Sequence, residues 1–303
     1  FTTRDLLVGV ATASLQIEGG DRNNNWYDWA QIPGTIADGS TPLRATDHWN
    51  RWREDTELMS ELGLELYRMG IEWSRIEPSE GYFSEAELDH YARMLEACRA
   101  RGLKPMVTLN HFTTPLWFAK RGGFEVADAP ALFARYCRKV AERLGGLMHM
   151  TTTFNEANIR LLVDLMPGFQ QALPAVKAAI AAAAKATDAP RFSRLAYADP
   201  GVVTPIMQEA HRRAYEAIKD ARPSLPVGVT LTTQDIQSAC DPALVAVYQR
   251  KLYGEWVGVA RSHADFFGVQ TYTRELFGPE GRLPPPDGQA LTLTGWEVYP
   301  QAL

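Results

Sequence analysis

The chain has 303 residues, of which 46% are hydrophobic and 22% charged, which is ordinary for a soluble globular protein with one core. Its formal net charge is −5 and its longest basic block is Arg212-Arg213, which argues against a nucleic-acid surface or a polybasic membrane tether. No segment approaches the roughly 18 apolar residues of a membrane-spanning helix, and residues 1–5 lack a signal-peptide pattern.

Short β-branched segments alternate along the chain with longer amphipathic ones. Strands are predicted, in chain order, at residues 7–13, 65–73, 104–111, 148–155, 227–233 and 265–273. Strands that alternate with helices in this way imply a parallel sheet buried under helices. The alternation fits a doubly wound sheet and a closed barrel equally well.

Helices are predicted between these strands from apolar spacing and from start signals. Residues 48–62 place apolar side chains at helical spacing, and Ser84 begins a capping box before an apolar face that ends near residue 98. The pairs Thr204-Pro205 and Asp241-Pro242 each offer an N-cap residue followed by proline, which predicts two further helix starts.

The alanine-rich segment 172–189 departs from the strand–helix rhythm. Alanine has the best helix propensity, so we predict a helical excursion after the fourth strand. A disordered linker between two domains is the alternative. With the helical interpretation, residues 1–303 are expected to form a single barrel domain.

The three cysteines, Cys98, Cys137 and Cys240, are odd in number and far apart, which argues against a zinc site and a disulfide scaffold. Cys98 and Cys137 fall on apolar helical faces and are predicted to be buried free thiols. This usage favours a reducing, cytoplasmic location. No metal-ligand spacing, phosphate-binding glycine loop or dinucleotide fingerprint suggests a cofactor or a bound metal.

Polar and aromatic side chains cluster where the predicted strands end, which is where barrels of alternating strands and helices carry their chemistry. These side chains are Gln16, Glu72, Arg75, His111, Asn155, Glu156 and Tyr272, with Trp73 and Trp117 nearby. Amides, imidazole and guanidinium bond hydroxyls in pairs, and flat rings stack on the apolar faces of pyranoses. Each residue alone has an ordinary structural explanation, but their joint placement predicts a sugar-binding site.

Six segments resemble, in the same order, the motifs of glycoside hydrolase family 1, the β-glucosidase and β-galactosidase family. They are GVATASLQIEG at 9–19, WSRIEP at 73–78, TLNHF at 108–112, TFNE at 153–156, DFFGVQTYT at 265–273 and GWEVYP at 295–300. The resemblance runs from about residue 5 to residue 303. It implies a (β/α)₈ TIM barrel, of which about six of the eight β/α units are present.

The resemblance also implies catalytic roles. Glu156 is expected to be the general acid/base of a retaining β-glycosidase, and Arg75 and Tyr272 to flank the nucleophilic carboxylate and keep it ionised. A retaining enzyme needs two carboxyl groups about 5–5.5 Å apart, one as proton donor and one as nucleophile. Glu156 closes a predicted strand, where partial burial would raise its pKa.

The sugar-binding roles implied by the resemblance fall on four residues. Asn155 is expected to bond the sugar 2-hydroxyl, and Gln16 and His111 to hold the side of the sugar that carries the 3- and 4-hydroxyls. Trp296 is expected to border the aglycone. The sequence departs locally from the family at Ala157, where proline is usual, and at 270–272, where Asn-Tyr-Tyr is usual. Both changes are expected to tune the site.

A larger departure concerns the nucleophile. The family places it in a Thr-Glu-Asn-Gly motif that ends the seventh strand, and this motif does not occur here. The nucleophile is therefore expected beyond residue 303, and the chain is expected to be a fragment that is inactive alone. Glu72, Glu77 and Glu297 are poor replacements, because they belong to other motifs.

The expected function is a retaining β-glycosidase whose partner is a small β-glucoside, β-galactoside, β-fucoside or oligosaccharide. One alternative is a non-catalytic sugar-binding or accessory protein derived from the same barrel, and another is a 6-phospho-β-glycosidase. A naturally shortened protein that closes its open sheet edges by forming a homo-oligomer is a third alternative. No nucleic acid or membrane is expected as partner.

Overall fold

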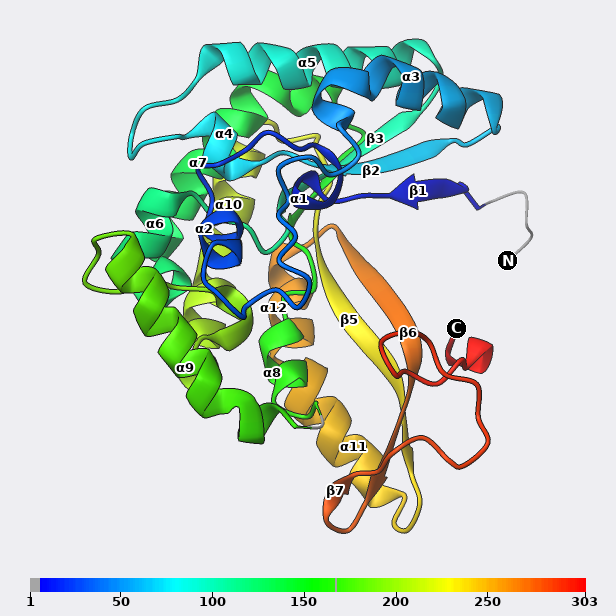
Figure 1. The fold of residues 1–303 in the computed structure, drawn as a ribbon. Coiled ribbons are helices and arrows are strands. Elements are labelled where there is room, and N and C mark those ends of the chain that lie inside the picture. Colours follow the sequence, from blue (N-terminus) through cyan, green and yellow to red (C-terminus); the bar gives the residue numbers. More distant parts are fainter. Residues whose placement is uncertain (1–5, 167) are drawn as a thin grey trace.

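The computed structural model describes residues 6–166 and 168–303 as one sheet flanked by helices (Figure 1). Its strands are β1 (Gly9–Ala11), β2 (Leu66–Gly70), β3 (Lys104–Asn110), β4 (Met150–Phe154), β5 (Val227–Ser238), β6 (Phe266–Gly278) and β7 (Gly281–Arg282). Each strand pairs with the next one along the chain, in parallel from β1 to β6 and as an antiparallel hairpin from β6 to β7. This is the strand order of a (β/α)₈ barrel, with six of its parallel strands.

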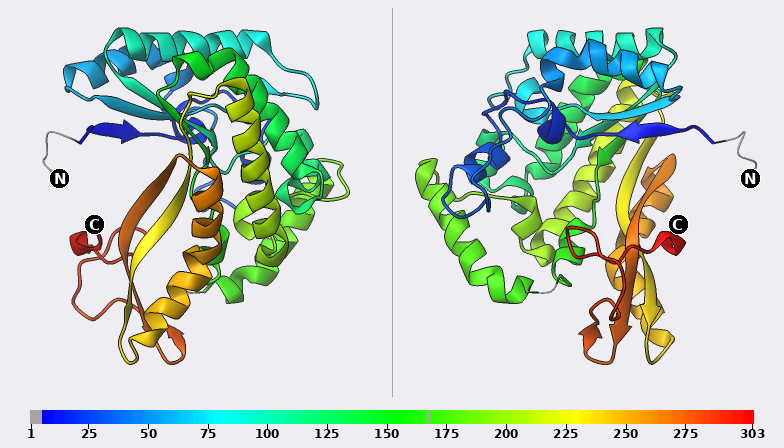
Figure 2. Two further views of the ribbon diagram at one scale, coloured as in Figure 1. Left: turned by 180° about the vertical axis from the view of Figure 1, so that it is seen from behind. Right: turned by 45° about the vertical axis from the view of Figure 1, so that its right-hand side comes forward.

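The helices lie outside the sheet, and shorter ones follow the strand ends. They are α1 (Ser14–Ile17), α2 (Asn25–Ala30), α3 (His48–Glu61), α4 (Trp73–Ile76), α5 (Glu85–Ala100), α6 (Leu116–Arg121), α7 (Ala129–Leu144), α8 (Ile159–Val163), α9 (Phe169–Ala186), α10 (Pro200–Ala221), α11 (Ala243–Gln249) and α12 (Glu255–His263). From behind, α10 and α12 run beside β5 and β6, and α7 packs along α10 (Figure 2). Across the residues described, none of these helices combines the length and apolar character needed to cross a bilayer.

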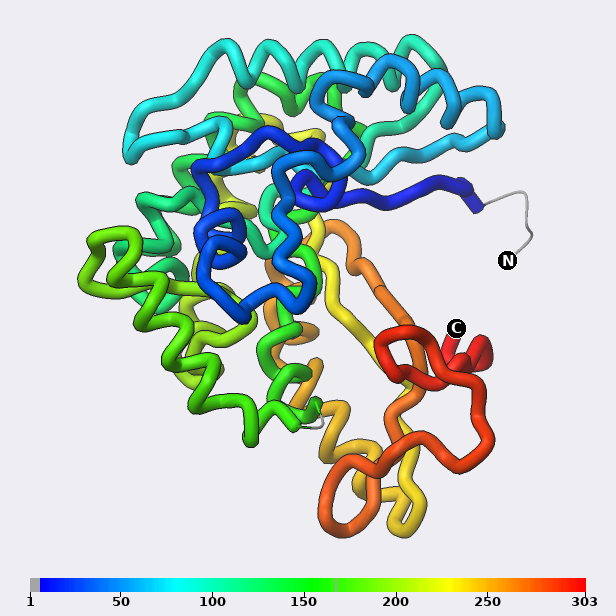
Figure 3. The backbone as a smooth tube through the Cα atoms, viewed as in Figure 1, coloured from blue at the N-terminus to red at the C-terminus, as the bar shows by residue number. Residues whose placement is uncertain are grey.

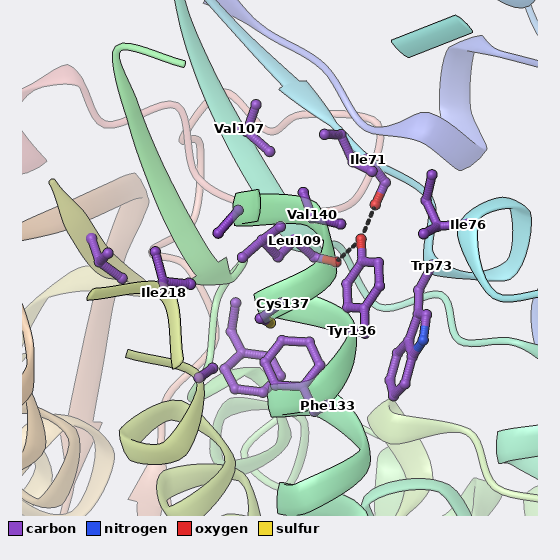
Figure 4. Packing of buried hydrophobic residues seen from close by; sticks show 14 of the residues in the cluster. Ile71, Trp73, Ile76, Val107, Leu109, Phe133, Tyr136, Cys137, Val140 and Ile218 are labelled. Carbon is purple, nitrogen blue, oxygen red and sulfur yellow. Dashed lines mark hydrogen bonds between the residues drawn. The ribbon is translucent and has the colours of Figure 1, made fainter. Parts of the chain in front are cut away.

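The main core lies between the strands and the covering helices. Trp73 and Tyr136 are fully buried in it and stack with a ring-centroid separation of 5.0 Å. The Tyr136 hydroxyl lies 2.7 Å from the carbonyl oxygen of Ile71 and 3.2 Å from that of Leu109, so its polar end is satisfied inside the core (Figure 4). These bonds hold α7 against the ends of β2 and β3, where the predicted site begins.

All six predicted strands are present, but their lengths differ from the prediction. β1 is limited to three residues, Gly9–Ala11. β5 and β6 continue to Ser238 and Gly278, beyond the predicted ends at 233 and 273. The two strands extend because they pair with each other as a ribbon beyond the body of the sheet.

Two predicted helices, α3 and α5, are confirmed, and Ser84 Oγ accepts the Glu87 backbone N–H at 3.4 Å as an N-cap. The predicted start at Thr204-Pro205 is wrong. α10 begins at Pro200, because Asp199 caps it by accepting from the Gly201 N–H at 2.8 Å, and Pro205 lies inside the helix. The helix therefore does begin with an N-cap residue followed by proline, but this pair is Asp199-Pro200 and not Thr204-Pro205.

The alanine-rich segment is helical, which confirms the excursion after β4 and makes the disordered linker wrong. α9 packs through Ala183 and Ile180 on a small core that contains Trp29 and Phe192. In Figure 1 it lies beside α2 and α6, on the side of the molecule away from β6. Small side chains along α9 permit this close approach.

The sheet is open between β1 and β6, whose ends diverge in Figure 3. Apolar side chains are exposed along both edges: Val8 (61%) and Val10 (39%) at β1, and Phe267 (40%) and Val269 (62%) on β6. Of the cysteines, Cys98 and Cys137 are buried free thiols, as predicted, and Cys240 is exposed.

Candidate active site

Glu156 begins the turn that follows β4, and the backbone there is unusual. Its φ of 45° lies in the left-handed region, which is costly for a residue with a side chain, and residues strained in this way cluster at functional sites. The Glu156 N–H donates to Thr230 Oγ1 at 3.2 Å, and the Ala157 N–H donates to the Thr230 carbonyl oxygen at 2.9 Å. Two bonds from β5 therefore hold the turn in place.

The Glu156 carboxyl lies close to Tyr272 of β6. The Tyr272 hydroxyl donates to Glu156 Oε1 at 2.7 Å. Burial raises the pKa of Glu156 above its ordinary value, opposed by the Tyr272 hydrogen bond and by the charge of Arg68. A raised pKa keeps more of the carboxyl protonated near neutral pH, as a proton donor requires.

The pairing of β6 with β5 shifts register at Tyr272, as in a β-bulge. Thr233 of β5 pairs with Thr271, and Asp235 pairs with Arg274. Between these two pairs β6 therefore advances by three residues while β5 advances by two. The extra residue falls at Tyr272 or the one that follows it. Bulges bend a strand and redirect side chains beside active sites, and this one coincides with the bond to Glu156.

Asn155 is buried beside Glu156, and its amide oxygen is fully engaged. Asn155 Oδ1 accepts from Arg68 Nη2 at 2.8 Å and from Gln270 Nε2 at 3.0 Å. Asn155 Nδ2 has no partner among the described residues. The arrangement therefore presents a buried donor with nothing to donate to.

The end of β3 supplies two more buried polar atoms that lack partners in the described part of the chain, Asn110 Oδ1 and His111 Nδ1. Burial lowers the pKa of His111 to about 3, with the charge of Arg68 as a second cause. The imidazole is neutral at ordinary pH, so it offers one donor and one acceptor. Together with Asn155 Nδ2, these buried atoms give the candidate site donors and acceptors that suit hydroxyls.

Arg75 and Tyr272 were expected to flank the same position, and the structure does not bring them together. Arg75 Nε bonds Glu18 Oε2 at 3.0 Å, its Nη2 donates to the Gly19 carbonyl, and its guanidinium stacks on Trp49 at 3.8 Å. Its charge is therefore already satisfied by a buried ion pair.

Arg68 of β2 holds the position beside Asn155, and the sequence reasoning missed it. It is 8% exposed and bonds Thr108 Oγ1 at 2.9 Å as well as Asn155 Oδ1. Among the described residues no carboxylate forms an ion pair with it. A charged residue inside the apolar strand Leu66–Gly70 was the signal that could have revealed it.

Gln16 and Trp296 lie in different parts of the face formed by the strand ends. Gln16 is on α1, exposed, and no described residue bonds its side chain. The Trp296 ring lies 5.3 Å from that of Tyr272 and borders a cavity of about 350 Å³. Leu162 of α8 and Leu165, which follows that helix, form an apolar wall of this cavity, and Gln234 lines it too.

Glu72, Glu77 and Glu297 each have structural partners. Glu77 accepts from Trp73 Nε1 at 2.8 Å, and Glu297 forms a two-bond ion pair with Arg274 at 2.8 and 2.9 Å.

The buried Glu72 lies in an acidic group with the buried Glu18 and the partly buried Asp21. Ser74 Oγ lies 2.6 Å from Asp21 Oδ2 and 3.0 Å from Glu72 Oε1. A hydroxyl donates one proton, so the second contact requires a protonated carboxyl. Burial raises the pKa of Glu18 and of Glu72 to about 7, which agrees with a protonated carboxyl in this group. Within the described ranges no group of three or more His, Cys, Asp or Glu side chains is arranged to hold a metal ion.

Fold and site together define a (β/α)₈-barrel protein with a buried carboxyl and hydroxyl-binding groups at its strand ends. Residues 2–243 match glycosyl hydrolase family 1, and the chain belongs to that family. A β-glucosidase of Agrobacterium sp. is 40% identical over 158 residues, which are 50% of this chain and 34% of that protein. The chain thus spans about a third of the length of that relative.

Solved structures agree along nearly the whole chain. The apo structure of beta-glucosidase 1317 superposes with a TM-score of 0.93 at 38% identity, covering 98% of this chain and 73% of the other. The crystal structure of beta-glycosidase BGL167 gives a TM-score of 0.91 at 40% identity, covering 99% and 73%.

Proposed function

We propose that this protein is a retaining β-glycosidase for β-glucosides or related β-glycosides, with Glu156 as its general acid/base. The observation that carries the proposal is the buried Glu156 carboxyl, held by Tyr272 beside unpartnered polar atoms of Asn155 and His111. The names of its relatives, β-glucosidases and a β-glycosidase, support the substrate class.

In this mechanism Glu156 first donates its proton to the glycosidic oxygen and later takes one from the water that completes hydrolysis. A raised pKa suits the first step, and the bond from Tyr272 stabilises the carboxylate needed for the second. Asn155 Nδ2 and His111 would bond sugar hydroxyls. Buried polar groups left unpaired without substrate make binding selective for a ligand that pairs them.

The second carboxylate of a retaining mechanism is expected to face Arg68 and Tyr272. Arg68 is a buried cation whose bonds go to the neutral side chains of Thr108 and Asn155. A buried guanidinium is stabilised by a nearby anion. Arg68 therefore takes the role that the sequence had suggested for Arg75.

The test is Glu156→Gln in the full-length protein, assayed on cellobiose and on a dinitrophenyl β-glucoside whose leaving group needs no protonation. We expect loss of cellobiose hydrolysis, retention of the first step on the activated substrate, and recovery of turnover with added azide, which needs no general base. Equal loss on both substrates without azide rescue removes Glu156 from this role.

A further inference from the structure

A second cavity lies on the helical excursion, apart from the Glu156 site. It has a volume of about 400 Å³ and is lined by α9 and by the segment that follows it, 190–198. It shares no lining residue with the cavity beside Trp296. In Figure 1, α9 lies on the opposite side of the molecule from β6, which carries Tyr272.

Arg194 lines this cavity and is buried without an anionic partner. It is 7% exposed, and its Nε–H has no hydrogen-bond acceptor among residues 6–166 and 168–303. No salt bridge joins it to a carboxylate of those residues. Buried charges are normally paired, because an unpaired one costs the desolvation of the ion.

Aromatic rings hold the Arg194 guanidinium in place. Its Cζ lies 3.9 Å from the Trp26 ring centre, 4.6 Å from that of Trp29 and 4.7 Å from that of Tyr197. Cation–π contacts of this kind position a cation without neutralising it. The segment before it is fixed by Asn25 Nδ2, which donates to the Ser193 carbonyl oxygen at 3.3 Å.

The rest of the lining favours an anion with an apolar body. Lys177 and Arg191 add two positive charges, and the one lining carboxylate, Glu125, already accepts from Ser193 Oγ at 2.9 Å. Ile180 and Phe192 supply apolar surface.

We propose that this cavity binds a small organic anion, whose carboxylate or phosphate group pairs with Arg194 and whose apolar body packs on α9. Arg191 and Lys177 attract the anion at the rim. The site is independent of the glycosidase proposal, because the test measures binding rather than hydrolysis.

The experiment is calorimetric titration of the protein with benzoate and with phenyl phosphate at fixed ionic strength. We expect saturable one-to-one binding that changes indole fluorescence, since Trp26 and Trp29 contact Arg194. Arg194→Met, which keeps an unbranched apolar stem against the rings, should weaken binding about 10- to 100-fold, the value of a charge-assisted bond.

Arg138→Met is the matched control, because Arg138 is an exposed arginine of α7 that pairs with Asp220 outside the cavity. It should leave binding unchanged. Arg191→Met, at the rim, should weaken binding by a smaller factor and carries the test if Arg194→Met does not fold.

The relative affinities of the two probes identify the preferred anionic group. The proposal is overturned by absence of saturable binding of either probe, or by equal weakening in the variants of Arg194 and Arg138. Inorganic phosphate that binds as tightly as phenyl phosphate would overturn the apolar contribution of α9.

Discussion

Tyr272 and Glu156 form the pair that sets the protonation state of the site. The Tyr272 hydroxyl donates to the Glu156 carboxylate and so favours its ionised form. Tyr272→Phe should therefore raise the pKa of Glu156. The alkaline limb of kcat/KM, which reports loss of the proton from the acid, should move up by about half to one pH unit, the worth of one such bond. A pH–rate profile checks this, and a downward shift of the limb would contradict it.

Arg68 and Arg75 are both buried arginines, but their surroundings predict different consequences of substitution. Arg68→Met removes a donor to Asn155 and the cation of the site, so kcat/KM should fall about 10²- to 10³-fold. Arg75→Met leaves Glu18 buried without its cation, so the free energy of unfolding should fall by about 3–5 kcal/mol.

Urea denaturation and steady-state kinetics on the full-length protein separate the two effects. An Arg75→Met variant that stays stable but loses as much rate as Arg68→Met would return Arg75 to the catalytic group.

At the junction of α1 and α4, the Glu72 carboxyl is buried near the carboxyl groups of Glu18 and Asp21. The pKa of Glu72 is raised from 4.5 to about 7, chiefly by burial, so the folded protein keeps a proton that the unfolded chain releases. The folded state thus binds more protons between these pH values, and the free energy of unfolding should fall as pH rises through them.

Glu72→Gln mimics the protonated carboxyl. At pH values above 7 it should raise the free energy of unfolding by about 1–3 kcal/mol and flatten the pH dependence. At pH 8, where Glu18 is ionised, the matched variant Glu18→Gln should instead destabilise the protein, because Arg75 loses its anion. Chemical denaturation from pH 5 to 8 measures both. A Glu72→Gln protein that is less stable than the parent at pH 8 would contradict the raised pKa of Glu72.

The open sheet gives the 303-residue chain two edges with exposed apolar side chains. Unpaired edges invite association, and Val269, 62% exposed, lies on one of them. The 303-residue chain should therefore self-associate with rising concentration, and Val269→Lys should reduce this association. Val247→Lys on α11, 56% exposed and away from the edges, is the control. Sedimentation velocity over a range of concentrations decides, and a monomer throughout would contradict the prediction.

The strand order and much of the site could be predicted because they depend on local signals. Apolar strands that alternate with helices predict a parallel sheet under helices, and the family resemblance adds the barrel. Because Asn155-Glu156 directly follows a predicted strand, both residues are expected at the strand-end face. Arg68 was missed because it lies within a strand, where its orientation depends on pairing with β3. The choice between Asp199 and Thr204 as cap of α10 likewise depends on packing. The bond between Tyr272 and Glu156 could not be predicted, since it requires a bulge formed by two strands together.

Because of that bulge, the structure of β6 depends on the number of its residues more than on their identity. Because side chains alternate between faces, one extra residue changes the phase of every side chain that follows it. A substitution near Tyr272 alters one contact, whereas deletion of one residue there would re-register the entire ribbon from Arg274 to the β7 hairpin. The ion pairs of Arg274 with Glu297 and of Glu275 with Arg282 therefore depend on the number of residues in β6 as well as on their identity.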